Sequence, residues 1–166
     1  MDTLSHVFVP LTALYLIKGK LSPSYLLAFF AIFPDLDKLL RIPGLFHSLL
    51  TLIPLTASIL FIEKHFRGSI KYSGLISFFI FSHLLLDLLD GGPVALLYPA
   101  SKIGVGLEFP MRLVLGKGIS IEGDAVRVVY SDPRISDSYE IFSGFGVVSA
   151  ILFAIVCLSS WRKSRS

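Results

Sequence analysis

Runs of apolar residues separated by short polar segments dominate the sequence. Three runs approach the roughly 20 residues that an α-helix needs to cross the hydrocarbon core of a bilayer. Two shorter runs near the N-terminal end hold about 14 residues each and would extend only about 21 Å as α-helices, which predicts a shallow hairpin. The predicted helices cover residues 4–17, 21–33, 45–62, 70–89 and 141–160.

Prolines and a serine mark several ends and bends in these runs. Ser22 and Pro23 are a typical N-cap and first-turn pair for the second helix, and Pro34 is expected to end it. Pro10 and Pro54 lie inside the first and third helices, where neighbouring helices can satisfy the freed carbonyl groups. We therefore expect kinks at these two positions.

The pattern changes between residues 91 and 140, where glycines recur and short stretches carry alternating or β-branched residues. Residues 107–130 predict a small β-hairpin or meander. This stretch is too polar to span a bilayer, so it is expected to form an outer loop over the mouth of the helices, as a lid or cap. The predicted fold is an all-α integral membrane protein, one domain over residues 1–166, with a small β-containing extracytoplasmic loop.

Composition agrees with a membrane protein. Hydrophobic residues make up 54% of the chain, charged residues only 16%, and the mean hydropathy is +0.76. A soluble domain of this size would expose apolar surface that water drives into aggregates. Cys157 is the only cysteine, so the chain has no internal disulfide and no cluster of thiolate metal ligands.

The distribution of charge predicts the orientation. Basic residues concentrate on the cytoplasmic side of membrane proteins. If the N-terminus is outside, the inner segments hold eight of the fifteen basic residues but only Glu63 among the twelve acidic ones. We therefore expect a multi-pass cell-membrane protein with five helices, its N-terminus outside and its C-terminus in the cytoplasm. The eight basic residues are Lys18, Lys20, Lys64, Arg67, Lys71, Arg162, Lys163 and Arg165.

Three histidines and three aspartates fall where predicted helices meet the outer side. An ionisable residue in hydrocarbon is costly, about 2.5 to 3.5 kcal/mol for Asp on the insertion scale, so this shared depth calls for an explanation. Any one of them could be an ordinary helix cap or a headgroup contact, but the coincidence of six predicts a metal site. The predicted ligands are His6, Asp35, Asp37, His47, His83 and Asp87. His65, in the basic inner loop, is assigned no role.

Spacing refines this prediction. His83 and Asp87 are four residues apart, which places both on one face of a helix. Asp35 and Asp37 alternate after a proline and can both turn toward a cation if the backbone there is extended. Imidazole with carboxylate suits zinc best, with manganese or iron as alternatives, and six ligands allow one or two ions.

Such a site can activate water at neutral pH and stabilise the charge on a phosphoryl group. Asp37 is the candidate to orient that water or to act as general base. Lys38 and Arg41 are the candidates to hold an anionic headgroup of the substrate, although basic residues at an interface often only meet lipid phosphates.

Four segments together resemble the YdjM-like family of membrane-bound, metal-dependent hydrolases. They are His6, "FPDLDK", "GLFHSLL" and "FSHLLLDLLDGGPVALLYP", in order over about residues 4–100. The resemblance implies a multi-pass membrane protein distantly related to the zinc-dependent phospholipase C superfamily. It also implies His6, Asp35, His47, His83 and Asp87 as metal ligands, with Asp37 as a further one.

The sequence departs from this family pattern at two places. Members often carry a histidine where Lys38 stands, and a "HRxxTH" stretch where this chain has residues 42–47. A single zinc ion with a weaker second site is therefore an alternative to two full sites.

The predicted function is hydrolysis of a phosphoester in a lipid or lipid-linked substrate at the outer membrane surface. The expected partners are the bilayer and that lipid, and no nucleic acid. An ion or proton transporter is one alternative, since intramembrane His and Asp also form ion pathways. A non-catalytic membrane scaffold with a structural metal site is another.

Overall fold

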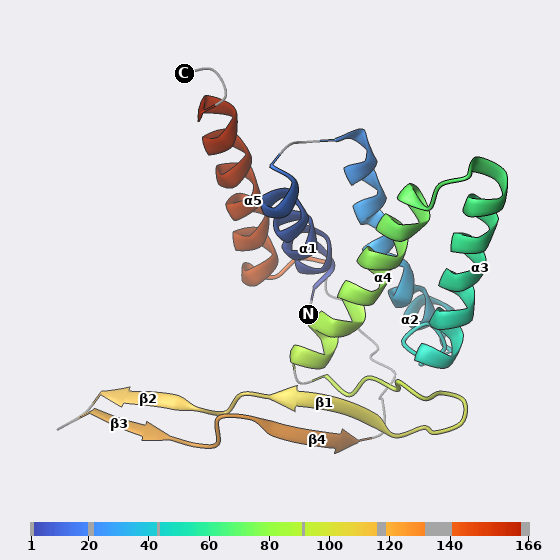
Figure 1. Cartoon of the computed structure of the whole chain (residues 1–166). Helices are drawn as coiled ribbons and strands as arrows, with labels where there is room; N and C mark the ends of the chain where they lie inside the picture. Colours follow the sequence, from blue (N-terminus) through green and yellow to red (C-terminus); the bar gives the residue numbers. More distant parts are fainter. Residues whose placement is uncertain are drawn as a thin grey trace.

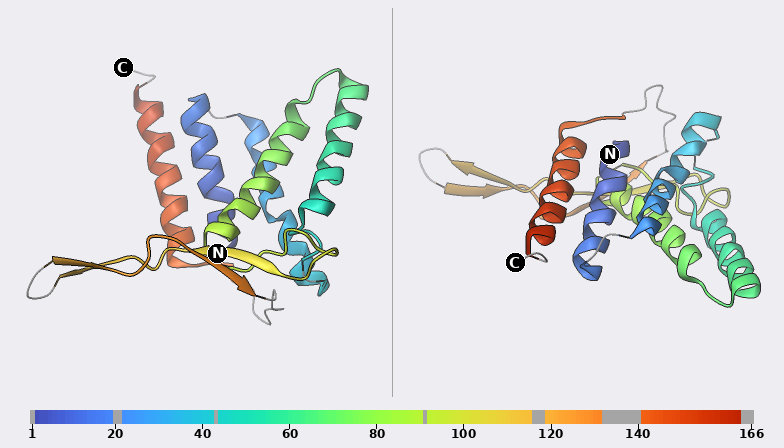
Figure 2. Two further views of the ribbon diagram at one scale, coloured as in Figure 1. Left: turned by 60° about the horizontal axis from the view of Figure 1, so that its bottom comes forward. Right: turned by 90° about the horizontal axis from the view of Figure 1, so that it is seen from above.

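The computed structural model describes residues 2–19, 22–42, 44–90, 92–115, 119–131 and 141–163. It is mostly helical, with a small β structure across one end of the helices (Figure 1). The helices are α1 (Thr3–Lys18), the 3-10 helix η1 (Pro23–Asp35), α2 (Leu36–Leu40), α3 (Leu49–Arg67), α4 (Lys71–Leu89) and α5 (Gly144–Lys163). Packing runs from α5 to α1, then to η1, α4 and α3, so the long helices follow one another across the bundle (Figure 2).

Side-chain caps and glycines set several of these boundaries. The Asp2 carboxylate accepts the Ser5 N–H at 2.9 Å and begins α1, and Gly19, in the left-handed conformation, ends it. Ser48 accepts the Leu50 N–H at 3.1 Å and begins α3. Because the cap stands there, α3 begins at residue 49 and not at the predicted residue 45.

The second apolar run is a 3-10 helix of 13 residues. A 3-10 helix rises about 2.0 Å per residue, so this segment extends about 26 Å, against about 20 Å for an α-helix of the same length. The predicted reach of this segment was too short because it assumed an α-helical rise. The prediction that Pro34 ends the helix is also wrong, since Pro34 lies within η1 and α2 follows directly.

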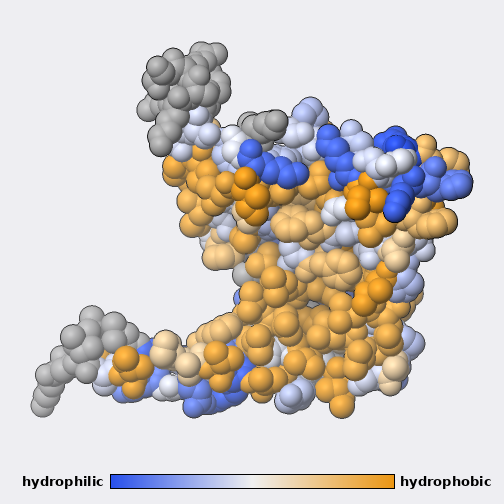
Figure 3. Space-filling view, viewed as in Figure 1, coloured by the Kyte–Doolittle hydropathy of each residue, from blue (hydrophilic) through white to orange (hydrophobic). Residues whose placement is uncertain are grey.

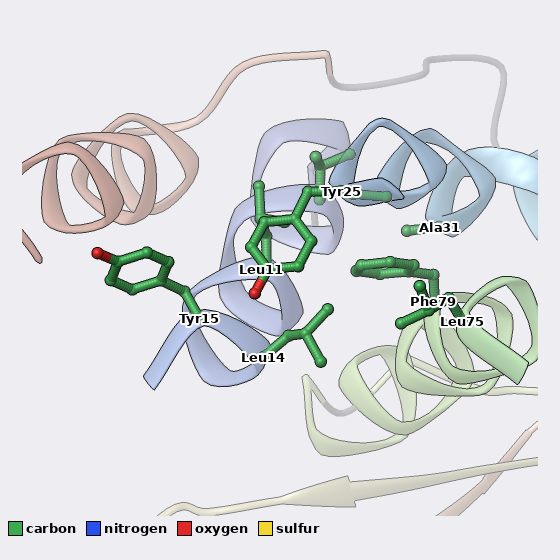
Figure 4. Close-up of a cluster of buried hydrophobic side chains, with 9 residues drawn as sticks. Leu11, Leu14, Tyr15, Tyr25, Ala31, Leu75 and Phe79 are labelled. Carbon is green, nitrogen blue, oxygen red and sulfur yellow. The ribbon is translucent and has the colours of Figure 1, made fainter. Parts of the chain in front are cut away.

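A cluster of buried apolar side chains joins α1, η1 and α4 (Figure 4). The cluster lies between the three elements, and Phe79 at its centre is fully buried. Close packing of this kind, rather than exclusion of water, is what holds helices together inside a bilayer. Its labelled members are Leu11, Leu14 and Tyr15 of α1, Tyr25 and Ala31 of η1, and Leu75 and Phe79 of α4.

The outer surface of the bundle is strongly apolar. Two helices of the described part, α3 and α4, are long and apolar enough to cross a membrane, while α1 and α5 are shorter apolar helices. Hydrophobic residues cover the middle of the bundle, and hydrophilic residues gather at the end where α3 joins α4 (Figure 3). Two spans are thus supported by length and composition, and the predicted five crossings stay a prediction.

Hydrogen bonds join α3 to α4 at one end of the hairpin and to the stretch after α4 at the other. At the end where the helices join, Glu63 accepts the Ser73 N–H at 2.6 Å. At the other end, the Leu49 N–H donates to the Leu96 carbonyl at 2.8 Å, and the Ser48 hydroxyl donates to the Tyr98 carbonyl. The stretch after α4 is thereby fixed against the start of α3.

The β structure is a long two-stranded ribbon. β1 (Gly104–Glu108) pairs with β4 (Arg127–Ser131), and β2 (Arg112–Leu115) pairs with β3 (Ile119–Glu122), both antiparallel. We call residues 104–115 and 119–131 the β arm. Val94 and Val105 exchange two backbone hydrogen bonds of 3.0 and 2.9 Å, which attach the base of the arm to the stretch after α4. The arm runs across the end of the bundle and projects sideways from it (Figures 1 and 2).

Candidate metal centre

Four of the six predicted ligands come together in one group. Asp35, His47, His83 and Asp87 each offer one ligand atom, and these four atoms lie within 4.8 Å of one another. Asp35 ends η1, His47 lies in the turn before α3, and the other two stand on one face of α4. Three of the side chains are buried and Asp87 is nearly so. These element ends all lie at the end of the bundle that the β arm crosses (Figure 1).

The imidazoles are held in one tautomer by their outer nitrogens. His83 Nδ1 lies 2.6 Å from the Ala31 carbonyl oxygen, and His6 Nδ1 lies 2.8 Å from the Asp2 carbonyl oxygen. His47 Nδ1 lies 2.8 Å from Asp37 Oδ2. Since these oxygens only accept, each Nδ1 carries a hydrogen, and the Nε2 atoms of His47 and His83 are left to face the centre. Metal-binding histidines are typically oriented in this way.

The spacing of the inner atoms is close to that of ligands around one metal ion. The two Nε2 atoms of His47 and His83 are 3.2 Å apart, and they lie 3.2 and 3.3 Å from Asp87 Oδ2. Asp35 Oδ1 is 3.6 Å from His83 Nε2 and 3.9 Å from His47 Nε2. Zinc–ligand bonds of about 2.0 to 2.1 Å place tetrahedral ligands about 3.3 Å apart. Two Nε2 atoms at this distance need a proton or a metal ion between them.

Electrostatics favour a positive charge at this place. Burial alone would lower the pKa of the His47 imidazole, but hydrogen bonds to Asp37 and Asp87 outweigh it and raise the pKa to about 9. The carboxylates around His47 therefore stabilise a cation strongly. A bound metal ion would satisfy the same carboxylates in place of that proton.

His6 lies beside this group and not within it. Its Nε2 is 2.9 Å from Asp87 Oδ1, while His47 and His83 approach the other carboxylate oxygen. The His6 ring stacks on His83, with ring centroids 3.9 Å apart. Asp87 therefore connects His6 to the group.

Asp37 takes a different place from the one predicted. The backbone at Asp35 and Asp37 is helical and not extended, and residues two apart on a helix point to opposite sides. Asp35 therefore faces the group, whereas Asp37 lies behind His47 and also accepts the Gly44 N–H at 3.1 Å. Its carboxylate orients an imidazole here, and the role of Asp37 as a ligand or general base stays a prediction.

The two predicted substrate-binding residues differ from each other. Lys38 Nζ lies 2.6 Å from Asp35 Oδ1, at the edge of the group. Burial would lower the pKa of the Lys38 ammonium, but the Asp35 carboxylate outweighs this and raises it, so Lys38 stays charged. Arg41 is exposed, in the left-handed conformation that ends α2, and no contact with the group is seen among the described residues.

Asp2 is a residue that the sequence reasoning missed. Its carbonyl orients His6, and its buried carboxylate accepts N–H groups from Ser5 and from Ser143, just before α5. Asp2 thus joins the starts of α1 and α5 behind the histidine. An Asp three residues before a Ser at the start of an apolar run is a helix-cap pattern that could have drawn attention to it.

Replacing Gly146 with alanine should disturb this arrangement. A Cβ at Gly146 would overlap the Asp2 carboxylate, whereas one at Gly144, two residues earlier in α5, meets nothing within 4 Å. We expect Gly146→Ala to lower the free energy of unfolding by about 1 to 3 kcal/mol, the usual range for overpacking. Thermal unfolding in detergent should show this loss, and Gly144→Ala should unfold like the wild type. Equal stability of the two variants would contradict the packing described here.

A mostly helical, apolar bundle with a buried histidine–carboxylate group defines a membrane protein with a candidate metal centre. The family model described as YdjM inner membrane protein matches residues 1–163, so the chain belongs to the YdjM inner membrane protein family. No curated protein and no solved structure matches the chain.

Proposed function

We propose that this protein is a metal-dependent hydrolase, embedded in the membrane, that cleaves a phosphoester in a lipid or lipid-linked substrate. The observation that carries the proposal is the convergence of two Nε2 atoms and two carboxylates at tetrahedral spacing, with each Nδ1 held by an oxygen. Two imidazoles with one carboxylate and an open fourth position are a ligand set of catalytic zinc. Zinc is therefore the proposed metal, with manganese as the alternative.

In this proposal His47, His83 and Asp87 would hold the metal, and Asp35 would face the fourth position, where a catalytic zinc keeps a water. The ion supplies a water of lowered pKa and stabilises negative charge on the phosphoryl group. His6 orients the Asp87 carboxylate or binds a second ion with it, and Asp37 keeps His47 in place. Water adds its oxygen to phosphorus, the bond from phosphorus to the leaving alcohol breaks, and the alcohol departs with a proton.

Lys38 is the proposed contact to the substrate phosphate. Its ammonium lies at the edge of the metal group, and its side chain is partly exposed. If a phosphodiester replaces Asp35 as the ion-pair partner of Lys38, the negative charge of the phosphate comes next to the metal. Arg41, which is exposed nearby in sequence, would at most contact the rest of an anionic headgroup.

The metal group lies at one end of the bundle, and this location supports a substrate at the membrane surface. The C-terminal end and the α3–α4 junction lie at one end of the bundle, and the N-terminal end and the β arm lie at the other (Figure 1). The basic residues Lys64, Arg67 and Lys71 stand at the α3–α4 junction. The positive-inside rule then gives an N-out, C-in orientation, with the metal group at the outer headgroups.

The structure supports the transporter alternative less well than the hydrolase proposal. An ion pathway needs ionisable groups through the depth of the membrane. In the described helices, ionisable side chains lie within about two turns of a helix end, counting about 3.6 residues per turn. This distribution supports a site at one surface.

A vesicle assay tests the proposed activity. The purified full chain, stripped with EDTA and reloaded with Zn²⁺ or Mn²⁺, is placed in phosphatidylglycerol vesicles, and released products are identified by mass spectrometry. We expect metal-dependent release of a headgroup phosphate or alcohol, lost in Asp35→Asn. Protein that binds the metal stoichiometrically yet releases neither product from phosphatidylglycerol, nor nitrophenol from the soluble probe bis(nitrophenyl) phosphate, would overturn the proposal.

A further inference from the structure

The distal half of the β arm, residues 109–115 and 119–126, has little support from the rest of the protein. Among the described elements, only β1 of the arm contacts a helix, α4. β2 and β3 pair with each other alone. A two-stranded ribbon without a hydrophobic face packed on something is marginally stable in water. The distal half therefore needs a surface to lie on.

The distal half also exposes large apolar side chains. Ile121 is 71% exposed, and the others are more than one-third exposed. Ile121 lies between Ser120 and Glu122 in β3, and Glu122 pairs with Arg112 across the ribbon. Because successive residues of a strand point to opposite faces, Ile121 lies on the face opposite to this charged pair. The exposed apolar residues are Phe109, Met111, Ile121 and Val126, together with Val114, which pairs with Ser120 and lies on the face of the charged pair.

The direction of the arm indicates which surface is available. The arm runs across the helices at the end of the bundle, and it extends beyond α5 when the bundle is viewed along its helices (Figure 2). A ribbon placed in this way lies parallel to the membrane that the bundle occupies. Hydrophobic residues continue from the side of the bundle down to the arm and gather again along it (Figure 3). The bilayer is thus the apolar surface next to the arm.

We propose that the distal β arm lies on the lipid surface, with Ile121 and its apolar neighbours at the boundary between headgroups and acyl chains. Amphipathic segments at membrane surfaces bury their apolar face about 5 to 10 Å deep in this way. The base of the arm is bonded to the stretch that holds the start of α3, next to His47. The arm therefore fixes the height of the metal group relative to the headgroups. This inference depends on the membrane location and not on hydrolase activity.

Tryptophan quenching by brominated lipid tests the contact. In a Trp161→Phe background, a single tryptophan is placed at Ile121 or, as the matched control on the opposite face, at Ser120. The full chain is reconstituted in vesicles whose lipid is brominated near the headgroup end of the acyl chains. We expect strong quenching for Ile121→Trp and markedly weaker quenching for Ser120→Trp.

A reference tryptophan at Ile155, an exposed apolar position of α5, reports whether the protein is inserted. If Ile155→Trp is quenched while Ile121→Trp is not, or if Ser120→Trp is quenched more strongly than Ile121→Trp, the proposal is overturned. A soluble quencher such as acrylamide should show the reverse order, with Ser120→Trp the more accessible position.

Discussion

Replacing both His83 and Asp87 with alanine is expected to abolish metal binding. These residues supply two of the four inner ligand atoms, and they stand one turn apart on α4. The remaining Asp35 and His47 cannot complete a tetrahedral site by themselves. We expect elemental analysis to find about one zinc or manganese ion per chain in the wild type and a trace in the double variant.

Two controls distinguish loss of the metal site from loss of an unrelated histidine and from loss of folding. His65→Ala removes a histidine that lies in the exposed last turn of α3, and it should retain the full metal content. His83→Gln with Asp87→Asn keeps the side-chain volumes and should also lose the metal, while circular dichroism and gel filtration report on folding. A folded double variant that still holds its metal, or a wild type that never binds one, would refute the candidate centre.

Replacing Asp37 should weaken metal binding without removing any inner ligand. Its carboxylate accepts the Nδ1–H of His47 and so orients the ring and raises its basicity. Loss of such a partner typically costs about 10 to 100-fold in metal affinity. We expect Asp37→Ala to fall in this range and Asp37→Asn to lose less, because an amide oxygen can still accept the hydrogen bond.

Competition with a chromophoric zinc chelator measures this effect. The matched control is Asp124→Ala, which removes an exposed carboxylate of the β arm that pairs only with Arg127 among the described residues. That variant should bind zinc like the wild type. An Asp37→Ala variant with unchanged affinity would show that His47 is oriented by other means.

The sequence predicted the helices better than it predicted their ends. The apolar runs predicted α1, α3, α4 and α5, because a long apolar segment in a bilayer must satisfy its backbone hydrogen bonds internally, as a helix does. The predicted start of α3 was wrong because Ser48 caps the helix, although the residues just before it include apolar ones. The conformation of η1 could not be foreseen, since a 3-10 helix and an α-helix need the same residue types.

The candidate site was predictable in its residues but not in its layout. The shared predicted depth in the membrane indicates His47, His83, Asp35 and Asp87 as site residues. The four-residue spacing of His83 and Asp87 predicts that both lie on one face of α4. The division between Asp35 and Asp37 depends on whether the backbone after Pro34 is helical or extended, which the sequence left open. The carbonyl groups that hold His6 and His83 belong to the backbone, so no side-chain pattern can reveal them.

The hairpin of α3 and α4 is closed by Glu63 with Ser73, and the start of α3 is bonded through Ser48 to Tyr98 in the stretch after α4. His47 and His83 therefore keep their separation whether or not an ion lies between them, and little ordering is left to be done on loading. A centre of this kind should give up its ion slowly to a chelator even where its equilibrium affinity is modest.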